Sequence, residues 1–182
     1  MAKTTIEEQL VKYLEDTHAL EQHVLKALDS MISTTDAPEL LGPLQEHRQQ
    51  TEAHLQRLEQ RLQAHGAKPT PVKEAGMIFA ALGLGLVHQV RDDDSGKHAR
   101  DGYVAEHLEI AAYEMLQRVA ARAGDTETAD VARRNLADEE AMAKTIAGSW
   151  DLAVDLSLKQ EGVVGAPPPE PPRRMSEDAR TS

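Results

Sequence analysis

Four long segments of this 182-residue chain repeat apolar residues with the period of an α-helix, and the connections between them are short, long and short. A short connection folds two helices into an antiparallel hairpin, so the first helix pairs with the second and the third with the fourth. Helix-forming Ala, Leu, Glu, Gln and Arg dominate, whereas aromatic residues make up only 3% of the chain, which favours helices over sheets. These features predict an all-α bundle.

Residues that start or stop helices mark the first hairpin. Thr5 opens a capping box at the start of the first helix, which ends within residues 33–36. The second helix begins near Pro38 and Pro43, with Pro43 expected in its first turn, and stops at Gly66. The first helix keeps its apolar period for roughly seven turns, which is long enough to form one full arm of a bundle.

The second hairpin follows a long connection that contains an apolar stretch of its own. Residues 77–90 are nearly all apolar but too few to span a bilayer, so we predict a buried helix or a subunit contact there. The third helix covers about residues 98–123, and the fourth runs from Asp125 or Thr126 into the 150s. Two hairpins joined by one long crossover are the ferritin-like arrangement of a four-helix bundle, which is the fold that we predict.

Composition limits the classes of function. The formal net charge is −11 and the predicted bundle has no dense basic cluster, which argues against nucleic-acid binding. Because the chain has no cysteine, disulfides, thiol catalysis and Cys-ligated metal centres are excluded. The first eight residues lack a signal pattern, so we expect a cytoplasmic protein. We expect the bundle to fill residues 1–161 and the Pro-rich residues 162–182 to be a disordered tail.

Three carboxylates lie on the apolar faces of predicted helices, where an unpaired charge is costly. Glu21 and Glu139 lie well inside the stripes of the first and fourth helices, and Glu109 lies on the edge of the third. Each is about 15 residues, or roughly 22 Å of helix, from the turn of its hairpin. His54, with His47 on the same shoulder of the second helix, reaches a similar depth. Acidic groups that meet in a core repel each other, so we predict a metal site at mid-height of the bundle.

Four strings within about residues 10–150 carry a family resemblance: Glu21-Gln22; His47 with Thr51 and His54-x-x-Arg57-Leu58-Glu59; Glu106-His107-x-Glu109-Ile110-Ala111-x-Tyr113; and Asp138-Glu139-Glu140. They resemble the YciE/YciF-like branch of the ferritin-like superfamily, bacterial proteins linked to stress responses. Carboxylate-bridged members of the superfamily place one Glu on each of two helices and Glu-x-x-His on each of the other two. The resemblance implies iron or manganese binding, redox activity toward oxygen or peroxide, and a homodimer.

Two positions depart from that pattern. Thr51 stands where the second helix should carry Glu, and Met142, a poor ligand for iron or manganese, stands where the fourth should carry His. The expected metal ligands that remain are Glu21, His54, Glu109 and Glu139. Water or four less certain ligands can fill the other coordination positions: His47, Glu52, Glu106 (a rival of Glu109) and Glu140. One or two ions can bind in this way, and one is the simpler case.

Two functions follow from these residues. The first is a ferritin-like protein of stress defence that binds iron or manganese, and it predicts that the ligands converge on one cavity. The second is a non-catalytic helical interaction protein with a degenerate metal site, which docks a partner through residues 77–90 or the Pro-rich tail. It predicts inward carboxylates that pair with Arg or splay apart. A storage cage is a third hypothesis, for which the sequence specifies no contacts.

Overall fold

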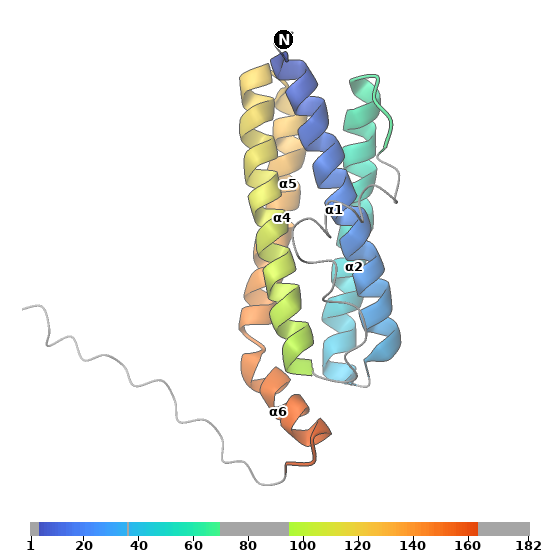
Figure 1. Cartoon of the computed structure of the whole chain (residues 1–182), viewed down its shortest axis with the longest axis vertical. Helices are drawn as coiled ribbons and strands as arrows, with labels where there is room; N and C mark the ends of the chain where they lie inside the picture. Colours follow the sequence, from blue (N-terminus) through green and yellow to red (C-terminus); the bar gives the residue numbers. More distant parts are fainter. Residues whose placement is uncertain (1–3, 36, 70–94, 164–182) are drawn as a thin grey trace, which may run out of the picture.

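The computed structural model describes residues 4–35, 37–69 and 95–163. Its helices are α1 (Ile6–Thr34), α2 (Pro38–Ala64), α4 (Ser95–Ala123), α5 (Thr126–Ala147) and α6 (Trp150–Gln160). The hairpins α1–α2 and α4–α5 have their turns at opposite ends of the bundle (Figure 1). Because α2 ends beside the start of α1 and α4 starts at the other end, the connection between the hairpins joins opposite ends. The predicted helix at 77–90 and residues 164–182 of the predicted tail lie outside the described residues.

The helix boundaries in the first hairpin follow the predicted start and stop signals with one difference. Thr5 caps α1, and its hydroxyl accepts a hydrogen bond from the backbone N–H of Glu8 at 3.1 Å. Gly66 follows α2 with a φ of 70°, a conformation that costs glycine little because it has no Cβ. Pro43 lies inside α2 and not in its first turn, because the helix already begins at Pro38.

The fourth predicted helix is in fact two helices. The prediction of one helix into the 150s is wrong, because α5 ends at Ala147 and α6 begins at Trp150. Gly148, which has poor helix propensity, lies at the break. Ser157 of α6 accepts a hydrogen bond from the backbone N–H of Gly96 at 2.7 Å, at the start of α4. This contact satisfies one of the N–H groups that a helix leaves free at its N-terminus, and it ties α6 to α4.

Asp125 joins the two hairpins at one end of the bundle. It caps α5 by accepting a hydrogen bond from the backbone N–H of Thr128 at 2.9 Å. It also pairs with Arg61 at 3.1 Å and with His65 at 2.8 Å, both near the end of α2. Burial raises the pKa of Asp125, but the hydrogen bonds from Thr128, His65 and Arg61 hold that pKa well below its ordinary value. These bonds fix the end of α2 against the turn between α4 and α5.

Two apolar clusters fill the bundle and leave buried polar residues between them. The larger cluster contains Leu10 and Leu14 of α1 with Leu58 and Leu62 of α2, together with residues of α4 and α5. The smaller one is formed by Leu20, Val24, Leu28 and Leu44. Each buried leucine contributes roughly 1.5–3 kcal/mol of transfer free energy. Along α2, the buried polar residues lie between Leu44 and Leu58, so the two clusters hold them at mid-height.

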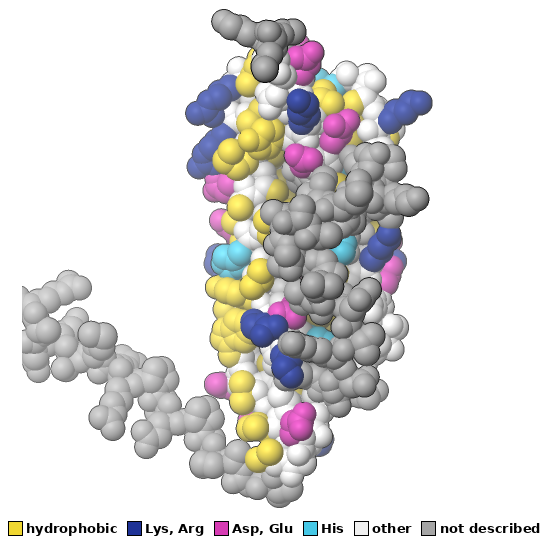
Figure 2. Space-filling view, in the orientation of Figure 1, with side chains coloured by type: hydrophobic (Ala, Val, Ile, Leu, Met, Phe, Trp, Pro, Cys, Tyr) yellow, Lys and Arg dark blue, Asp and Glu magenta, His cyan; other side chains and the backbone are white. Residues whose placement is uncertain are grey.

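The outer surface carries both charged and apolar side chains (Figure 2). Large apolar side chains that are at least one-third exposed include Val104 of α4 and Trp150 and Val154 of α6. The rings of Tyr103 and Trp150 pack edge to face, with centroids 5.3 Å apart, which helps to hold α6 against α4. Within the described part of the chain, no helix is long and apolar enough to cross a membrane.

Candidate metal centre

All four helices of the two hairpins contribute buried acidic or imidazole side chains at mid-height. These side chains, each at most 3% exposed, are Glu21 of α1, His47 and His54 of α2, Glu106 and Glu109 of α4, and Glu139 of α5. Residues three, four or seven apart share one helix face, which is why α2 presents both histidines and α4 both glutamates to the interior. The four ligands expected from the sequence therefore lie in one interior region.

One part of this centre joins α1, α2 and α5. Nδ1 of His54 lies 3.2 Å from Oε1 of Glu21 and 2.9 Å from Oε1 of Glu139. Tyr113 donates a short hydrogen bond from its hydroxyl to Oε1 of Glu21. Oε2 of Glu21 is buried and has no hydrogen-bond partner among the residues that the structure describes. Glu21, His54 and Glu139 each offer one ligand atom, and these atoms all lie within 4.8 Å of one another.

A second part of the centre joins α2, α4 and α5. Nε2 of His47 lies 3.1 Å from Oε1 of Glu106 and 3.7 Å from Oε2 of Glu139. Both carboxylate oxygens of Glu109 are buried, and neither has a hydrogen-bond partner in the described ranges. One ligand atom from each of His47, Glu106, Glu109 and Glu139 lies within 4.8 Å of the others. Glu139 thus belongs to both groups of donors.

The outer ring of the centre contains residues that hold the inner ones in place. Nε2 of His54 lies 3.0 Å from Oδ2 of Asp138, a carboxylate that is 36% exposed. Asn135 donates a hydrogen bond from Nδ2 to the hydroxyl of Tyr113 at 2.9 Å. Neither Asn135 nor Asp138 is predicted as a partner from the sequence. Asn135, four residues before Glu139 on α5, shares its helix face, which is a usable signal, whereas Asp138 is adjacent to Glu139 and has none. Partners of this kind orient metal-binding histidines and carboxylates in known metal sites.

Burial and the charges of neighbouring groups raise the pKa values of the buried carboxylates Glu21, Glu106 and Glu109. Burial, followed by the charges of Glu139, Glu21 and Glu106, raises the pKa of Glu109 well above its ordinary value. Burial is also the largest cause that raises the pKa of Glu21. The pKa of Glu106 rises to about 7, because burial outweighs the opposing effect of His47. Without a cation, these acidic groups therefore tend to keep protons.

The pKa values of the two histidines are raised as well, although burial alone would lower them. Burial lowers the pKa of His54, but hydrogen bonding to Glu139 and Glu21 and the charges of both outweigh it and raise the pKa to about 10. For His47, burial is again opposed, mainly by Glu106, and the pKa rises to about 9. At neutral pH and without a metal, both imidazoles therefore carry protons on nitrogens that face carboxylates.

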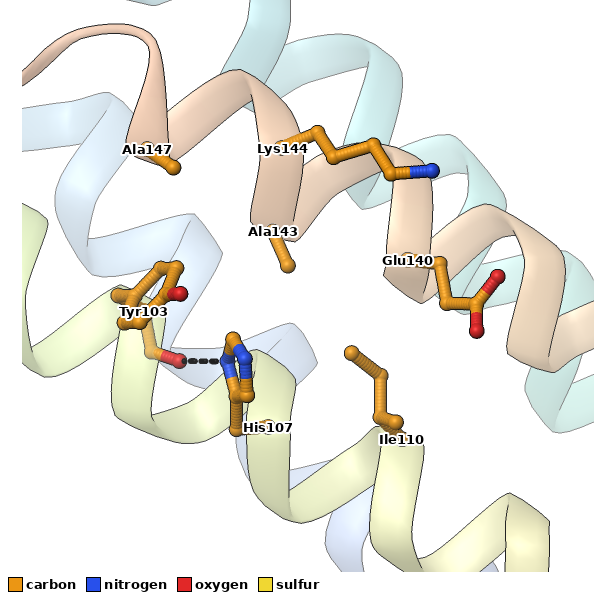
Figure 3. A pocket seen from close by; sticks show the side chains of 7 residues that line it. All are labelled: Tyr103, His107, Ile110, Glu140, Ala143, Lys144 and Ala147. Atoms are coloured by element: carbon orange, nitrogen blue, oxygen red, sulfur yellow. Dashed lines mark hydrogen bonds between the residues drawn. The ribbon is translucent and has the colours of Figure 1, made fainter. Parts of the chain in front are cut away.

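Two of the less certain ligands do not reach the centre. Glu52 lies on a more exposed face of α2, where its side chain is 43% exposed and pairs with Arg48 at 2.8 Å. Glu140 is exposed on α5 and lines an outer hollow of about 340 Å³ beside Lys144 and His107 (Figure 3). Both side chains lie outside the buried cluster because of helix phase: a position next to a buried residue points about 100° away from it. His47 and Glu106, by contrast, lie within the centre.

The buried face of α4 also differs from the predicted one. The apolar period of this helix predicts Glu109 at the edge of the buried face. In the structure, Glu106, Glu109 and Tyr113 lie within the buried face, and Leu108 and Ala112 are only partly buried, against the smaller apolar cluster. The reason is that α4 packs against α1 and against α5, so the face between them is buried even though it is polar.

Glu109→Leu is expected to stabilise the metal-free protein. A buried polar group without a hydrogen-bond partner costs about 1–3 kcal/mol, and leucine removes that cost at similar volume. The free energy of unfolding in urea, measured after removal of metals by a chelator, should rise by about that amount. The control Glu114→Leu, at a side chain that is 39% exposed, should change it by less than about 0.5 kcal/mol. A loss of stability at Glu109 would contradict this explanation of its environment.

The donors fit a hard or intermediate divalent cation. Carboxylate oxygens and imidazole nitrogens are the ligands that manganese and iron take in proteins. Oε2 of Glu21 and both oxygens of Glu109 are buried without a hydrogen-bond partner, and no Arg or Lys pairs with Glu21, Glu106, Glu109 or Glu139 among the described residues. A cation is the partner that would neutralise them, and the residues present therefore fit a metal of this class.

Comparisons with known proteins agree with the fold. A model of the domain of unknown function DUF892 matches residues 5–157. A protein from Xanthomonas campestris has a similar structure, with a TM-score of 0.73 and 25% identity over 86% of this chain and 98% of that one. The stress protein YciF of E. coli gives a TM-score of 0.68 and 21% identity, covering 84% and 97%.

A third solved structure, described as ferritin-like, diiron-carboxylate proteins from Bacillus anthracis, gives a TM-score of 0.67 and 16% identity, covering 81% of this chain and 99% of that one. These similarities confirm the predicted ferritin-like four-helix bundle.

Proposed function

The chain belongs to the DUF892 family, and from the buried acidic centre of its bundle we propose that it binds iron or manganese in stress defence. The observation that carries the proposal is Glu109, whose two carboxylate oxygens are buried without a hydrogen-bond partner in the described part of the chain. A buried carboxylate without a partner lowers the stability of the fold, and a bound ligand that supplies the missing partner explains why such a group is present. The core ligands in this proposal are Glu21, His54, Glu109 and Glu139, as predicted from the sequence.

The similar proteins support the same class of function. The Bacillus anthracis proteins that share this fold are described as diiron-carboxylate proteins, and YciF of E. coli is described as a stress protein. Bound iron or manganese supplies one-electron redox chemistry toward oxygen or peroxide. The chain's own part is to keep water away from the carboxylates and to hold protons on His47 and His54 until a cation displaces them. A cytoplasmic location and a homodimer stay predictions.

Metal reconstitution tests this proposal. Purified protein, stripped of metal and titrated with Mn²⁺ or with Fe²⁺ without oxygen, should bind about one or two equivalents per chain. At a free metal concentration of 100 times Kd, binding stabilises the fold by about 2.7 kcal/mol, which raises Tm by roughly 5–11 °C. The double variant Glu21→Ala with Glu139→Ala should lose both effects. Calorimetry that detects no binding, with no metal-dependent change in melting, would reject the proposal.

The second function, a non-catalytic interaction protein with a degenerate site, has one specific observation in its favour. Val104, Trp150 and Val154 expose apolar surface on α4 and α6 that a partner can cover. Its other expectation, inward carboxylates paired with Arg or splayed apart, differs from the geometry, because Glu21 and Glu139 converge on His54. If reconstitution fails, this function becomes the better interpretation of the bundle.

A further inference from the structure

We propose that the Pro-rich C-terminal segment, residues 164–182, folds back within the same chain and docks in the outer hollow between α4 and α5. Its prolines cover the aromatic wall of the hollow, and its charged residues pair with Lys144 and Glu140. The lining of the hollow, the place where the chain leaves α6 and the order of charges in the segment support this inference. It does not depend on metal binding at the centre.

The hollow combines an aromatic wall, an apolar floor and two opposite charges (Figure 3). Tyr103 and His107 of α4 form the wall, with ring centroids 4.2 Å apart, and Trp150 of α6 packs edge to face on Tyr103. The floor consists of Ile110, Ala143 and Ala147. Glu140 and Lys144 lie one turn apart on α5, and neither forms an ion pair within the part of the chain that the structure describes.

A proline-rich segment is the class of ligand that such a surface binds. Polyproline II helices dock on aromatic side chains, and they lose little conformational entropy on binding because the free segment is already extended. Residues 166–174 read Ala-Pro-Pro-Pro-Glu-Pro-Pro-Arg-Arg, a composition that favours this conformation. The same chain therefore carries an aromatic-lined hollow and a segment of the kind that binds to one.

Helix α6 brings the start of this segment to the correct end of α4. Ser157 of α6 contacts Gly96 at the start of α4, whereas Trp150 at the other end of α6 contacts Tyr103. The two helices are therefore antiparallel, and the chain leaves α6 beside the start of α4. Val163, the last described residue, follows directly after α6. The segment thus begins on the side of the hollow that Trp150 and Tyr103 border.

The length of the segment is sufficient to cross the hollow. Tyr103 lies seven residues beyond Gly96 on α4, or about 10 Å, and Ile110 lies about 21 Å beyond it. A polyproline II helix advances about 3.1 Å per residue, so Pro167 is about 12 Å and Arg173 about 31 Å from Val163. Pro167 can therefore reach the aromatic wall, and the arginine can reach the far end of the hollow.

Charge complementarity fixes the direction of the docked segment. With three residues per turn, Pro167, Glu170 and Arg173 share one face of a polyproline II helix, about 9 Å apart. From the α6 end of the hollow, α5 presents first Lys144 and then Glu140 (Figure 3). Glu170 therefore meets Lys144, and Arg173 meets Glu140. The reverse direction would bring like charges together, which disfavours it.

Acrylamide quenching of Trp150 fluorescence tests this inference, because Trp150 is the single tryptophan of the chain and acrylamide carries no charge. Glu140→Arg faces Arg173 with a like charge, which should lower the ratio of docked to free segment by about two- to fivefold and raise the quenching constant. Adding Arg173→Glu and Arg174→Glu to Glu140→Arg should restore weak quenching. The control Glu46→Arg, with the same charge change at an exposed position of α2, should quench like the wild type.

A second variant tests the prolines. Pro167→Ser with Pro168→Ser and Pro169→Ser removes the rings that cover the aromatic wall, so it should quench at least as strongly as Glu140→Arg. All the substituted positions lie on the exposed surface or outside the described residues, so circular dichroism of each variant should match that of the wild type. Wild-type quenching in Glu140→Arg or in the proline variant would overturn the inference, and so would a charge swap that does not restore weak quenching.

Protein concentration identifies which copy supplies the segment. A tethered segment acts at an effective concentration of about 1 mM, so the wild-type quenching constant should not change between about 1 and 100 µM protein. A constant that falls as protein concentration rises would place the segment on a second copy and overturn docking within one chain. Each of these measurements uses metal-stripped protein, so their failure would leave the proposed function intact.

Discussion

Glu139→Gln is expected to abolish binding of Mn²⁺ or Fe²⁺, whereas Glu140→Gln, one residue further along α5, is expected to leave it unchanged. Glu139 is fully buried and contributes a ligand atom to both groups of donors, so its loss removes one metal ligand from each group. Removal of residues that only orient metal ligands already costs 10–100-fold in affinity in known sites, so loss of a shared ligand should cost at least about 100-fold. Glutamine keeps the volume and the polarity of the side chain.

Equilibrium dialysis with metal analysis measures this effect, and thermal melting without metal controls for folding. Glu139→Gln removes one of four mutually repelling carboxylates but also the charged partner of His54, so the two effects offset each other and the metal-free variant should melt close to the wild type. Its melting temperature should no longer respond to added Mn²⁺. Glu140→Gln should melt and respond like the wild type, because Glu140 lies at the outer hollow shown in Figure 3. Wild-type affinity in Glu139→Gln would show that this carboxylate is not a ligand.

The fold could be predicted largely from local sequence signals. The capping box at Thr5, the positive-φ glycines Gly66 and Gly124, and the Asp125 cap all mark helix ends that the structure contains. The break at Gly148 had a signal of the same kind, but the apolar period on both sides of it favours one continuous helix. Signals within a single helix are thus sufficient for the architecture, and connection lengths supply the topology.

The centre could be predicted only in part, because burial depends on which helices pack together. Glu21 and Glu139 lie well inside apolar stripes, where a single carboxylate is conspicuous in the sequence. His47 and Glu106 lie on faces that look polar, and only the packing of α2 against α5 and of α4 against α1 encloses them. Glu52 and His47 are both among the less certain ligands predicted from the sequence. In the structure, Glu52 pairs with Arg48 at the surface, whereas His47 faces Glu106 in the interior. Apolar periodicity predicts a helix face as buried only when most of its residues are apolar. It therefore misses a buried face on which polar side chains of two helices contact each other.

Metal affinity is expected to rise with pH between 6 and 8, and metal binding at pH 7 is expected to release protons. Without a cation, the pKa of His54 is about 10 and that of His47 about 9, so both hold protons that must leave before their nitrogens bind a metal. The pKa of Glu106, at about 7, adds a further proton over this range. Each displaced proton makes the affinity rise about tenfold per pH unit.

Calorimetry in buffers of different ionisation enthalpy counts the protons released. About two or more protons per loaded chain are expected at pH 7, and His54→Gln should release about one fewer. Glu140→Gln, which is exposed and outside the centre, should match the wild type. Affinity that does not change between pH 6 and 8 would contradict the protonation of these histidines.

The same protonation gives the metal-free protein the opposite response to pH. The histidine pKa values are raised on folding, so the stability that these pairs contribute is fully present below about pH 6.5 and is lost as pH rises through 9 to 10. The raised pKa values of Glu106 and Glu109 act in the same direction, because repulsion grows as these groups ionise. The melting temperature of stripped protein should therefore fall from pH 6 to 9, while the increase caused by saturating Mn²⁺ grows. Because Glu139 both pairs with the protonated histidines of the metal-free bundle and belongs to both groups of donors, both trends should weaken together in Glu139→Gln.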